Sequence, residues 1–256
     1  MRGGCFASSD HATRDRRAFA QKREGTTLIR MVSNTEASTH DGYRVLAQGA
    51  GFVVVDKACG LLSVPGIGPD KADCLVARVA LRFPGARIVH RLDRDTSGVM
   101  VLATDAATHR RLSMAFEARQ VQKAYHALVA GHVHGEEGRI DLPLRKEALG
   151  SAKQIVCHEQ GRPSQTRWRV ETRLDAVPAS VRANDAPFPC TLLRLEPLTG
   201  RSHQLRVHLL SLGHAILGDN LYAPPSMVDA ATRLCLHAST LGFEGATYTA
   251  PHPFRD

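Results

Sequence analysis

The chain has 256 residues, of which 43% are hydrophobic and 23% are charged, a composition typical of a globular protein. Its 33 Lys and Arg outnumber its 25 Asp and Glu, and the resulting net charge of +8 favours a polyanionic partner such as nucleic acid. No apolar run approaches the roughly 20 residues that cross a bilayer, and the basic N-terminus lacks the apolar stretch of a secretory signal, so a cytoplasmic protein without membrane contact is expected.

The cysteines and histidines form no recognisable metal or disulfide pattern. No two cysteines are spaced as Cys-x-x-Cys, so reduced thiols are expected. Among the 13 histidines, His132 with His134 and His203 with His208 are close in sequence, but no carboxylate or cysteine set completes a ligand spacing. We therefore predict no metal site. The six cysteines are Cys5, Cys59, Cys74, Cys157, Cys190 and Cys235.

Residues 1–42 are expected to precede the folded part as a basic, disordered leader. Residues 1–30 carry seven basic and three acidic side chains and show neither helical nor strand periodicity. Such a leader could bind RNA weakly, or it could arise from a start codon assigned upstream of Met31. The sequence leaves both alternatives open and predicts one folded domain at residues 43–256.

In the first half of this domain, short β-branched runs alternate with two helical patterns. Apolar residues recur at helical spacing over residues 73–83, behind the possible N-cap Asp73 and before Pro84 and Gly85. Residues 106–119 show the second helical pattern. Strands are expected at residues 51–56, 61–64, 88–89, 99–103 and 125–129.

In the second half, strands follow one another without regular intervening helices. Strands are expected at 139–144, 166–171 and 190–195, a loop at 176–189, and a helix at 202–212. This order argues for an α+β fold, with a mixed, largely antiparallel sheet and flanking helices, rather than a doubly wound α/β fold.

The strongest local signal is the polar segment 90–98, His-Arg-Leu-Asp-Arg-Asp-Thr-Ser-Gly, which lies between two short expected strands. Loops held by strands are common positions for catalytic groups. Arg91 and Arg94 flank Asp93, and nearby positive charge keeps a carboxylate ionised, as a nucleophile requires. The residues alone leave open a surface turn in which Asp93 and Asp95 pair with these arginines.

Four ordered blocks resemble the RluA family of pseudouridine synthases. Residues 90–98 are similar to its H-R-L-D-x-x-T-S-G signature, and residues 123–131 to its K-x-Y-x-A strand. Residues 198–208 resemble its G-R-T/S-H-Q-L-R-V-H block, and residues 213–222 its G-H-P-I-x-G-D-x-x-Y segment. The resemblance runs from about Tyr43 to the C-terminus, and it implies a pseudouridine synthase fold over residues 43–256 and isomerisation of uridine in RNA.

The resemblance also implies the roles of individual residues. Asp93 would be the essential carboxylate, and Arg201 would form an ion pair that keeps it charged and oriented. Tyr125 would stack against the uracil and take the proton lost from C5. Leu205 would form an apolar wall for the base, and Arg91 would hold the RNA open around the flipped nucleotide. The residues expected to bind the substrate are His90, Arg91, Thr96, Leu205 and Arg206.

The reaction implied by the resemblance requires no cofactor. Uridine and pseudouridine share one formula, because an N1 to C1′ bond is exchanged for a C5 to C1′ bond. Whether Asp93 attacks the ribose or the uracil ring first stays open, but in either route it acts as an anion. One departure from the family pattern is Asp-Lys-Ala-Cys-Gly at residues 56–60, where a proline is lost from the usual N-K-P-x-G turn, and this turn is expected to belong to the scaffold.

The expected partner is RNA rather than DNA. Too few ordered residues are expected before Tyr43 to form the S4 domain of larger family members, so the resemblance implies the short branch, which modifies the tRNA anticodon loop and a 23S ribosomal RNA hairpin. We rank both RNAs first, 23S ribosomal RNA alone second and tRNA alone third, and we expect the chain to act as a monomer.

Two other classes of protein stay open from the sequence. One is a non-catalytic RNA-binding module, and the other is a glycosidase, which needs two carboxylates about 5 to 10 Å apart. A glycosidase would require the side chain of Asp95 to face the same cleft as that of Asp93. The net charge does not decide between them, since only six basic residues are lysine and an arginine-rich coding bias would raise it equally.

Overall fold

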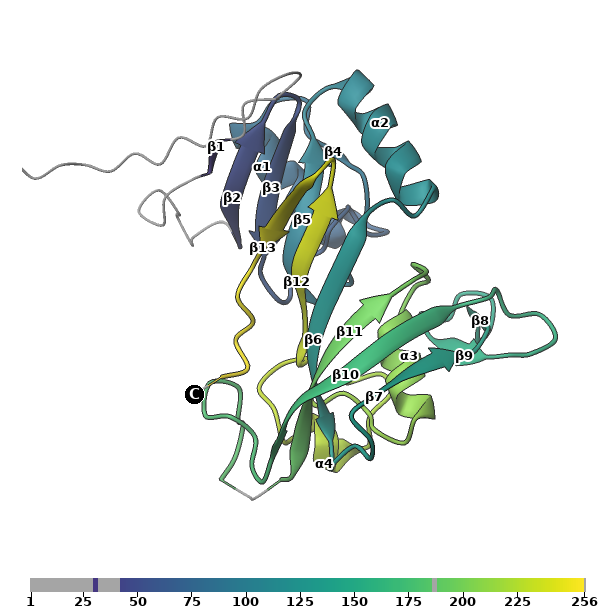
Figure 1. Ribbon diagram of the computed structural model, residues 1–256. Helices are drawn as coiled ribbons and strands as arrows, with labels where there is room; N and C mark the ends of the chain where they lie inside the picture. Colours follow the sequence, from purple (N-terminus) through teal and green to yellow (C-terminus); the bar gives the residue numbers. More distant parts are fainter. Residues whose placement is uncertain (1–29, 32–41, 186–187, 256) are drawn as a thin grey trace, which may run out of the picture.

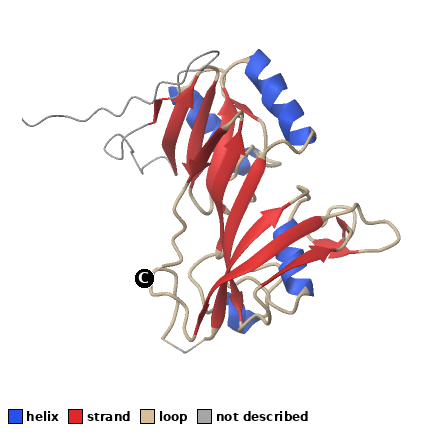
Figure 2. Ribbon diagram, in the orientation of Figure 1, coloured by secondary structure: helices blue, strands red, loops and turns tan. Residues whose placement is uncertain are grey.

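The computed structural model describes residues 30–31, 42–185 and 188–255. Within these ranges eleven strands form one sheet in the order β1-β2-β3-β5-β12-β6-β11-β10-β7, with β4 paired to β5 and β13 to β12 (Figures 1 and 2). All neighbouring strands are antiparallel except β5 and β12. The predicted α+β class with a mixed, largely antiparallel sheet is confirmed. The strands are β1 (Arg30–Met31), β2 (Tyr43–Gly49), β3 (Phe52–Lys57), β4 (Arg87–Ile88), β5 (Ser97–Ala103), β6 (Gln122–Ala130), β7 (Glu137–Asp141), β10 (Gln165–Leu174), β11 (Cys190–Pro197), β12 (Leu236–Phe243) and β13 (Ala246–Thr249), and a separate hairpin is formed by β8 (Leu144–Lys146) and β9 (Gln154–Val156).

The sheet carries two hydrophobic cores, one in each half of the molecule (Figure 1). The first core lies on β2, β3 and β5 and receives apolar side chains from α1 (Leu75–Arg82) and α2 (Ala106–Glu117). The second lies on β6 and β11 and receives them from α3 (Gln204–Ser211). Tyr125 of β6 packs against both cores. The short helices Pro69–Lys71 and α4 (Pro225–Val228) complete the described helices, none of which is long and apolar enough to span a bilayer.

The two helices expected in the first half are present, with different starts. Asp105 caps α2, since its Oδ1 accepts a hydrogen bond from the Thr108 N–H at 2.8 Å. In α1 the N-cap is Cys74, so the expected N-cap Asp73 was wrong. The carboxylate of Asp73 instead accepts two hydrogen bonds from the Arg78 guanidinium, at 2.7 and 2.6 Å, and is not available to cap the helix.

Some expected strands differ from the observed ones. Residues 61–64 form a loop rather than a strand, and the expected strand 139–144 is divided into β7 and β8. The division falls at Pro143, which has no N–H to donate to a strand ladder. Strands β12 and β13 were not predicted, although β12 lies at the centre of the sheet.

Gly98 allows the one parallel pairing of the described sheet. Gly98 lies opposite Ala238 of β12, and its φ is +117°. A Cβ at this position would lie 2.1 Å from the Ala238 carbonyl oxygen, so a larger residue could not occupy it without a shift of the backbone. The glycine of the Thr-Ser-Gly block therefore has a structural role, which is to hold the start of β5 against β12.

The expected leader, residues 1–42, lies almost entirely outside the described residues. Of this segment, Arg30 and Met31 form β1, which pairs with Gln48 and Ala47 of β2. Strand β2 begins at Tyr43. The start of the folded domain at this residue stays a prediction.

Candidate active site

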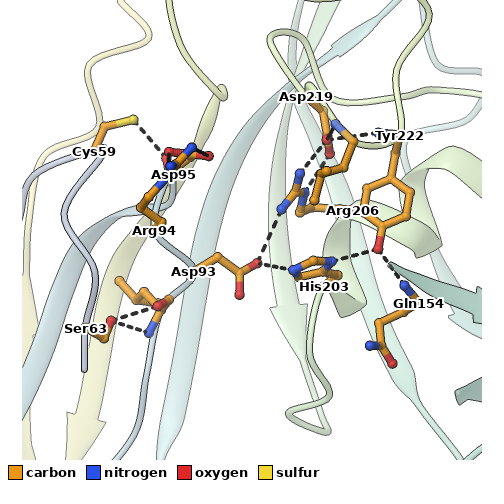
Figure 3. A network of polar contacts seen from close by, with 12 residues as sticks. Cys59, Ser63, Asp93, Arg94, Asp95, Gln154, His203, Arg206, Asp219 and Tyr222 are labelled. Atoms are coloured by element: carbon orange, nitrogen blue, oxygen red, sulfur yellow. Dashed lines mark hydrogen bonds and ion pairs between the residues drawn. The ribbon is translucent and has the colours of Figure 1, made fainter. Parts of the chain in front are cut away.

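Asp93 lies in the loop between β4 and β5, and hydrogen bonds hold the backbone on both sides of it (Figure 3). Ser63 Oγ donates to the Leu92 carbonyl at 2.7 Å and accepts from the Leu92 N–H at 3.2 Å. Lys57 Nζ donates to the Arg94 carbonyl at 3.0 Å. The tertiary contacts of this loop therefore fix where the Asp93 side chain starts.

The turn at residues 56–60 takes part directly in this support. Lys57 is fully buried, and its ammonium donates to two carbonyls of its own segment, at 2.8 Å each, as well as to that of Arg94. Burial lowers the pKa of Lys57 to about 8. The Gly60 N–H donates to the same Arg94 carbonyl at 2.9 Å. The sequence predicts that this turn belongs to the scaffold. In the structure it is hydrogen-bonded to the loop that carries Asp93.

The Asp93 side chain faces a pocket of about 540 Å³ that is lined from both halves of the molecule. The β4–β5 loop and the end of α2 line one side, and β6 with the start of α3 lines the other. Five lining residues are Arg or Lys and two are Asp or Glu, so the pocket suits an anionic ligand. The basic residues are Arg91, Arg119, Lys123, Arg201 and Arg206, and the acidic ones are Asp93 and Glu117.

One oxygen of the Asp93 carboxylate faces two nitrogen-bearing side chains. Arg206 Nη1 and His203 Nε2 each lie 3.7 Å from Asp93 Oδ2 (Figure 3). Asp93 Oδ1 has no hydrogen-bond partner among the residues that the structure describes. Both contacts are longer than a hydrogen bond, so charge attraction orients Oδ2 toward these side chains and leaves Oδ1 open to a ligand.

The expected ion pair between Asp93 and Arg201 was wrong, because the guanidinium in ion-pair range of Asp93 belongs to Arg206. Arg206 lies in the first turn of α3, next to the side chain that the N-cap residue His203 presents to Asp93. Arg201 precedes the helix, and its backbone N–H donates to Gln204 Oε1 at 3.0 Å. Its side chain lines the same pocket, with a buried Nε that has no hydrogen-bond partner.

Arg206 is held by a second carboxylate. Its Nε donates to Asp219 Oδ2 at 2.7 Å and its Nη2 to Oδ1 at 2.5 Å, and the two side chains are 3% and 1% exposed. Burial by itself lowers the pKa of Arg206, but the hydrogen bonds and charge of Asp219, with the charge of Asp93, raise it by more. The guanidinium beside Asp93 therefore stays charged.

Tyr125 of β6 and Leu205 of α3 both line the pocket. Tyr125 sits in the middle of the sheet, opposite Leu195 of β11 and Ala238 of β12. Burial, and then the negative charge of Asp93, raise the pKa of the Tyr125 phenol. Leu205 is buried and contributes an apolar surface to a lining of mixed polar and apolar side chains.

The three remaining expected residues also line the pocket. Arg91 is exposed at its rim, and the buried Thr96 closes the turn by donating its N–H to the Asp93 carbonyl at 3.2 Å. His90 stacks on Phe116, with ring centroids 4.5 Å apart, and its desolvation lowers its pKa to about 3. All eight residues expected from the sequence are thus brought to one pocket. They are His90, Arg91, Asp93, Thr96, Tyr125, Arg201, Leu205 and Arg206.

Sequence reasoning gave no role to three residues that complete the polar network of the site. His203, Asp219 and Tyr222 are all part of the family-like blocks at 198–208 and 213–222, which was the signal available. In the structure, the Tyr222 hydroxyl lies 2.7 Å from His203 Nδ1. Asp219 Oδ1 accepts from the Tyr222 N–H at 3.2 Å, so one carboxylate orders both Arg206 and Tyr222.

The Asp95 carboxylate does not join that of Asp93. It accepts a hydrogen bond from Arg94 Nε at 3.0 Å and does not line the pocket, and Figure 3 shows the two carboxylates pointing in different directions. The paired-carboxylate arrangement that a glycosidase would have built from Asp93 and Asp95 is therefore not formed.

Within the described residues, one trio of side chains could ligate a metal ion, and none of its members lines the pocket. His126 Nε2 lies 3.0 Å from Glu171 Oε1, and the rings of His126 and His252 stack with centroids 4.3 Å apart. The histidine pairs noted in the sequence are not part of this trio.

The fold and the pocket define a class of RNA-modifying enzyme. The model of the family described as RNA pseudouridylate synthase matches residues 51–211. The chain belongs to the RluA family of these synthases, which convert uridine to pseudouridine, and the reading as a non-catalytic RNA-binding module is set aside. Two relatives, named dual-specificity RNA pseudouridine synthase RluA, are those of Yersinia pestis, 44% identical over 82% of this chain and 97% of the relative, and Escherichia coli (strain K12), 43% identical over 80% and 88%.

Solved structures agree with this assignment. Human RNA pseudouridylate synthase domain containing 1 matches with a TM-score of 0.68 and 31% identity, over 84% of this chain and 85% of that one. Human RNA pseudouridylate synthase domain containing 4 matches with a TM-score of 0.62 over 82% of this chain and 88% of that one. Its 23% identity supports the fold alone.

Proposed function

We propose that this enzyme isomerises one uridine in the tRNA anticodon loop and one in a hairpin of 23S ribosomal RNA, with Asp93 as the nucleophile. The observation that carries the proposal is the asymmetry of the Asp93 carboxylate, whose Oδ2 faces Arg206 and His203 while Oδ1 is left open on a basic pocket. The dual specificity stated in the names of the relatives supports two RNAs. We further propose that the enzyme acts as a monomer in the cytoplasm.

The chemistry follows from a charged carboxylate with one free oxygen. Asp93 Oδ1 attacks either C1′ of the ribose or the uracil ring, and the N1 to C1′ bond breaks. The uracil then rotates, C5 bonds to C1′, the C5 proton is lost and N1 gains a proton. Product and substrate have the same formula, and Asp93 is released as the anion that began the cycle. Arg206 favours that anion in a site from which the bound base excludes water.

Tyr125 and Leu205 enclose the base in this proposal, Tyr125 by stacking and Leu205 as an apolar wall. Tyr125 is also the proposed acceptor of the C5 proton. Its raised pKa keeps the phenol protonated in the free enzyme. Esterification of Asp93 removes its negative charge, which is the smaller of the two causes of that rise, so the pKa of the phenol falls and loss of its hydrogen becomes easier. The phenol hydrogen passes to N1 of the uracil, and the C5 proton then replaces it on Tyr125, so Tyr125 ends the cycle protonated.

Arg91, Arg119 and Arg201 are proposed to bind RNA phosphates at the pocket. Arg201 suits this role, because its buried Nε has no hydrogen-bond partner and lies in the pocket lining. Hairpin loops already have weakened stacking, which lowers the cost of a few kcal/mol for flipping the target nucleotide into the pocket. One pocket can therefore accept a base from two different loops.

The test is to incubate the purified enzyme with isolated anticodon stem-loops and with the ribosomal hairpin, and to map the product by carbodiimide-dependent primer extension. We expect pseudouridine in both RNAs. The Asp93→Asn variant should lose activity by several powers of ten while its RNA affinity stays within a few fold. Asp95→Asn is the matched control and should be far milder, since Asp95 pairs with the exposed Arg94. Activity only on long ribosomal fragments, with none on either hairpin, would contradict the small-loop substrate.

A further inference from the structure

His203 lies between Tyr222 and Asp93, and its tautomer decides which of its two ring nitrogens carries the hydrogen. The ring bridges two groups, with Nδ1 2.7 Å from the Tyr222 hydroxyl and Nε2 3.7 Å from Asp93 Oδ2 (Figure 3). Burial lowers the pKa of His203, and the nearby Arg206 lowers it further, while the charge of Asp93 opposes this. The imidazole is therefore neutral near pH 7 and carries a single N–H, on one side or the other.

The bonding of Tyr222 decides between the two tautomers. The Gln154 N–H, in β9, donates to the Tyr222 oxygen at 2.8 Å. Burial raises the pKa of this phenol, so the hydroxyl keeps its hydrogen. The Tyr222 oxygen already accepts a hydrogen bond from Gln154. Its own hydrogen is therefore donated to His203 Nδ1. With Nδ1 as an acceptor, the single N–H of His203 is on Nε2, the nitrogen that faces the Asp93 carboxylate.

We propose that Tyr222 and His203 are positioning residues for Asp93, and that the directed chain from the Gln154 N–H through the Tyr222 hydroxyl and the His203 ring presents Nε2–H to Oδ2. This inference rests on the proposed role of Asp93. It adds a second N–H, next to Arg206, whose dipole attracts Oδ2 across 3.7 Å, a distance longer than a hydrogen bond, and leaves Oδ1 as the oxygen that attacks.

The backbone supports a dedicated position for His203. Its φ of 52° and ψ of 18° place it in the left-handed region at the N-cap of α3, where it makes no side-chain capping bond. A residue other than glycine is uncommon in this region and persists only where its surroundings hold it. The Tyr222 ring meets the imidazole edge to face at 5.6 Å, and Asp219 fixes the Tyr222 backbone.

The first arm of the test uses a double-mutant cycle. Tyr222→Phe removes the hydroxyl but keeps the ring over Arg206, and we expect the single-turnover rate at saturating RNA to fall about tenfold. His203→Gln places an amide N–H where Nε2–H was, without needing Tyr222, so its rate should stay within about threefold of wild type. In the His203→Gln background, adding Tyr222→Phe should lower the single-turnover rate by less than about twofold. Tyr248→Phe removes a hydroxyl that is buried and unpartnered, and this matched control should leave the rate unchanged.

The second arm needs no substrate. Long-range ¹H–¹⁵N correlation spectra of the free enzyme, with His203 assigned by comparison with His203→Gln, should show the Nε2–H tautomer, and Tyr222→Phe should populate the other tautomer. An Nδ1–H tautomer in wild type, or an equal cost of Tyr222→Phe in both backgrounds, would overturn the relay. If wild-type enzyme modified neither hairpin, the proposed function would fail, and the spectra alone would then decide whether the relay exists.

Discussion

Asp93 and Asp219 lie on two sides of the same guanidinium. Arg206 makes a two-pronged hydrogen bond with Asp219 and presents Nη1 to Asp93 at 3.7 Å, which is ion-pair range but longer than a hydrogen bond. The interaction with Asp219 is therefore the main one that keeps Arg206 charged in its buried position. The Asp93 carboxylate receives the field of this charge without being bound tightly to it, and it stays free to become an ester during the reaction.

This arrangement separates the roles of the two arginines in the Gly-Arg-Ser-His-Gln-Leu-Arg block. Arg206→Gln removes the cation beside Asp93, and the rate at saturating RNA should fall by at least about 100-fold. It should also destabilise the fold by about 3 to 5 kcal/mol, because it leaves the Asp219 charge buried without its partner. Urea denaturation measures the second effect independently of the first.

Arg201→Ala, by contrast, should leave the rate at saturating RNA within about threefold of wild type. Its RNA affinity should fall, and the slope of log affinity against log salt should decrease by about 1, because one phosphate contact is lost. Fluorescence anisotropy at several salt concentrations measures this slope. A collapse of the rate at saturating RNA would show that Arg201 reaches Asp93 in the complex.

The buried Lys57 makes the stability of the fold depend on pH. Its pKa is about 8 in the folded chain, compared with about 10.4 for an unfolded lysine. Between these values the unfolded chain binds more protons at this residue, so the contribution of Lys57 to the free energy of unfolding increases as pH rises from about 8 to about 10.4. The free energy of unfolding of wild type minus that of Lys57→Met should therefore increase over this pH window. The exposed Lys153→Met is the control, and equal pH dependence in both variants would contradict the buried charge.

At the scale of the elements, the contact between β5 and β12 connects the loop of Asp93 to the centre of the sheet. Strand β5 begins at Ser97, four residues after Asp93, and it meets β12 at Ser97 and Gly98. Strand β12 in turn pairs with β6, which carries Tyr125. The three strands thus place the proposed nucleophile and the proposed stacking residue in one rigid frame.

Gly98→Ala should break this frame. The added Cβ would lie 2.1 Å from a backbone carbonyl oxygen, and the φ of +117° is unfavourable for alanine, so we expect a loss of stability of several kcal/mol and a large loss of activity. Gly150→Ala is a matched control, because Gly150 also has positive φ (+82°) but has nothing within 4 Å of its added Cβ. That control should cost about 1 kcal/mol. Similar losses in the two variants would show that φ alone, and not the close approach to β12, requires glycine.

At the scale of the whole molecule, the pocket exists because two separately packed halves meet along β6 and β12. Among the described residues, both cores are built from Tyr43 onward, and the pocket lining begins at Val89. The halves supply different groups to the site. The first supplies Asp93 and the rim arginine Arg91, and the second supplies Arg206 and Leu205.

A chain that starts at Met31 should therefore fold and catalyse as the full chain does. Its melting temperature should be nearly unchanged, since the two cores, as far as the described residues form them, lose no side chain. Circular dichroism and the single-turnover assay measure these two properties. A lower melting temperature would show that the removed residues pack on the domain. A selective fall in RNA affinity, steepest at low salt, would assign their net charge of +4 to phosphate contacts.

The sequence by itself determined the fold class, the family and eight of the residues that line the pocket, because each of these depends on local periodicity or on motifs whose own residues are neighbours in the chain. It also located Asp93 in a loop between two strands. These properties are carried by neighbouring residues, so they can be read without knowledge of the tertiary structure.

The tertiary structure alone decided which of these side chains interact. Arg201 and Arg206 are both basic and five positions apart, and only the direction of α3 selects Arg206 as the partner of Asp93. The support of the Asp93 loop by Lys57 is equally invisible in the sequence, because it joins residues 37 positions apart. Strand β12 pairs with the adjacent β13, but its position at the centre of the sheet comes from β5 and β6, which are more than a hundred positions away. Such distant pairings leave no periodic trace in the strand itself.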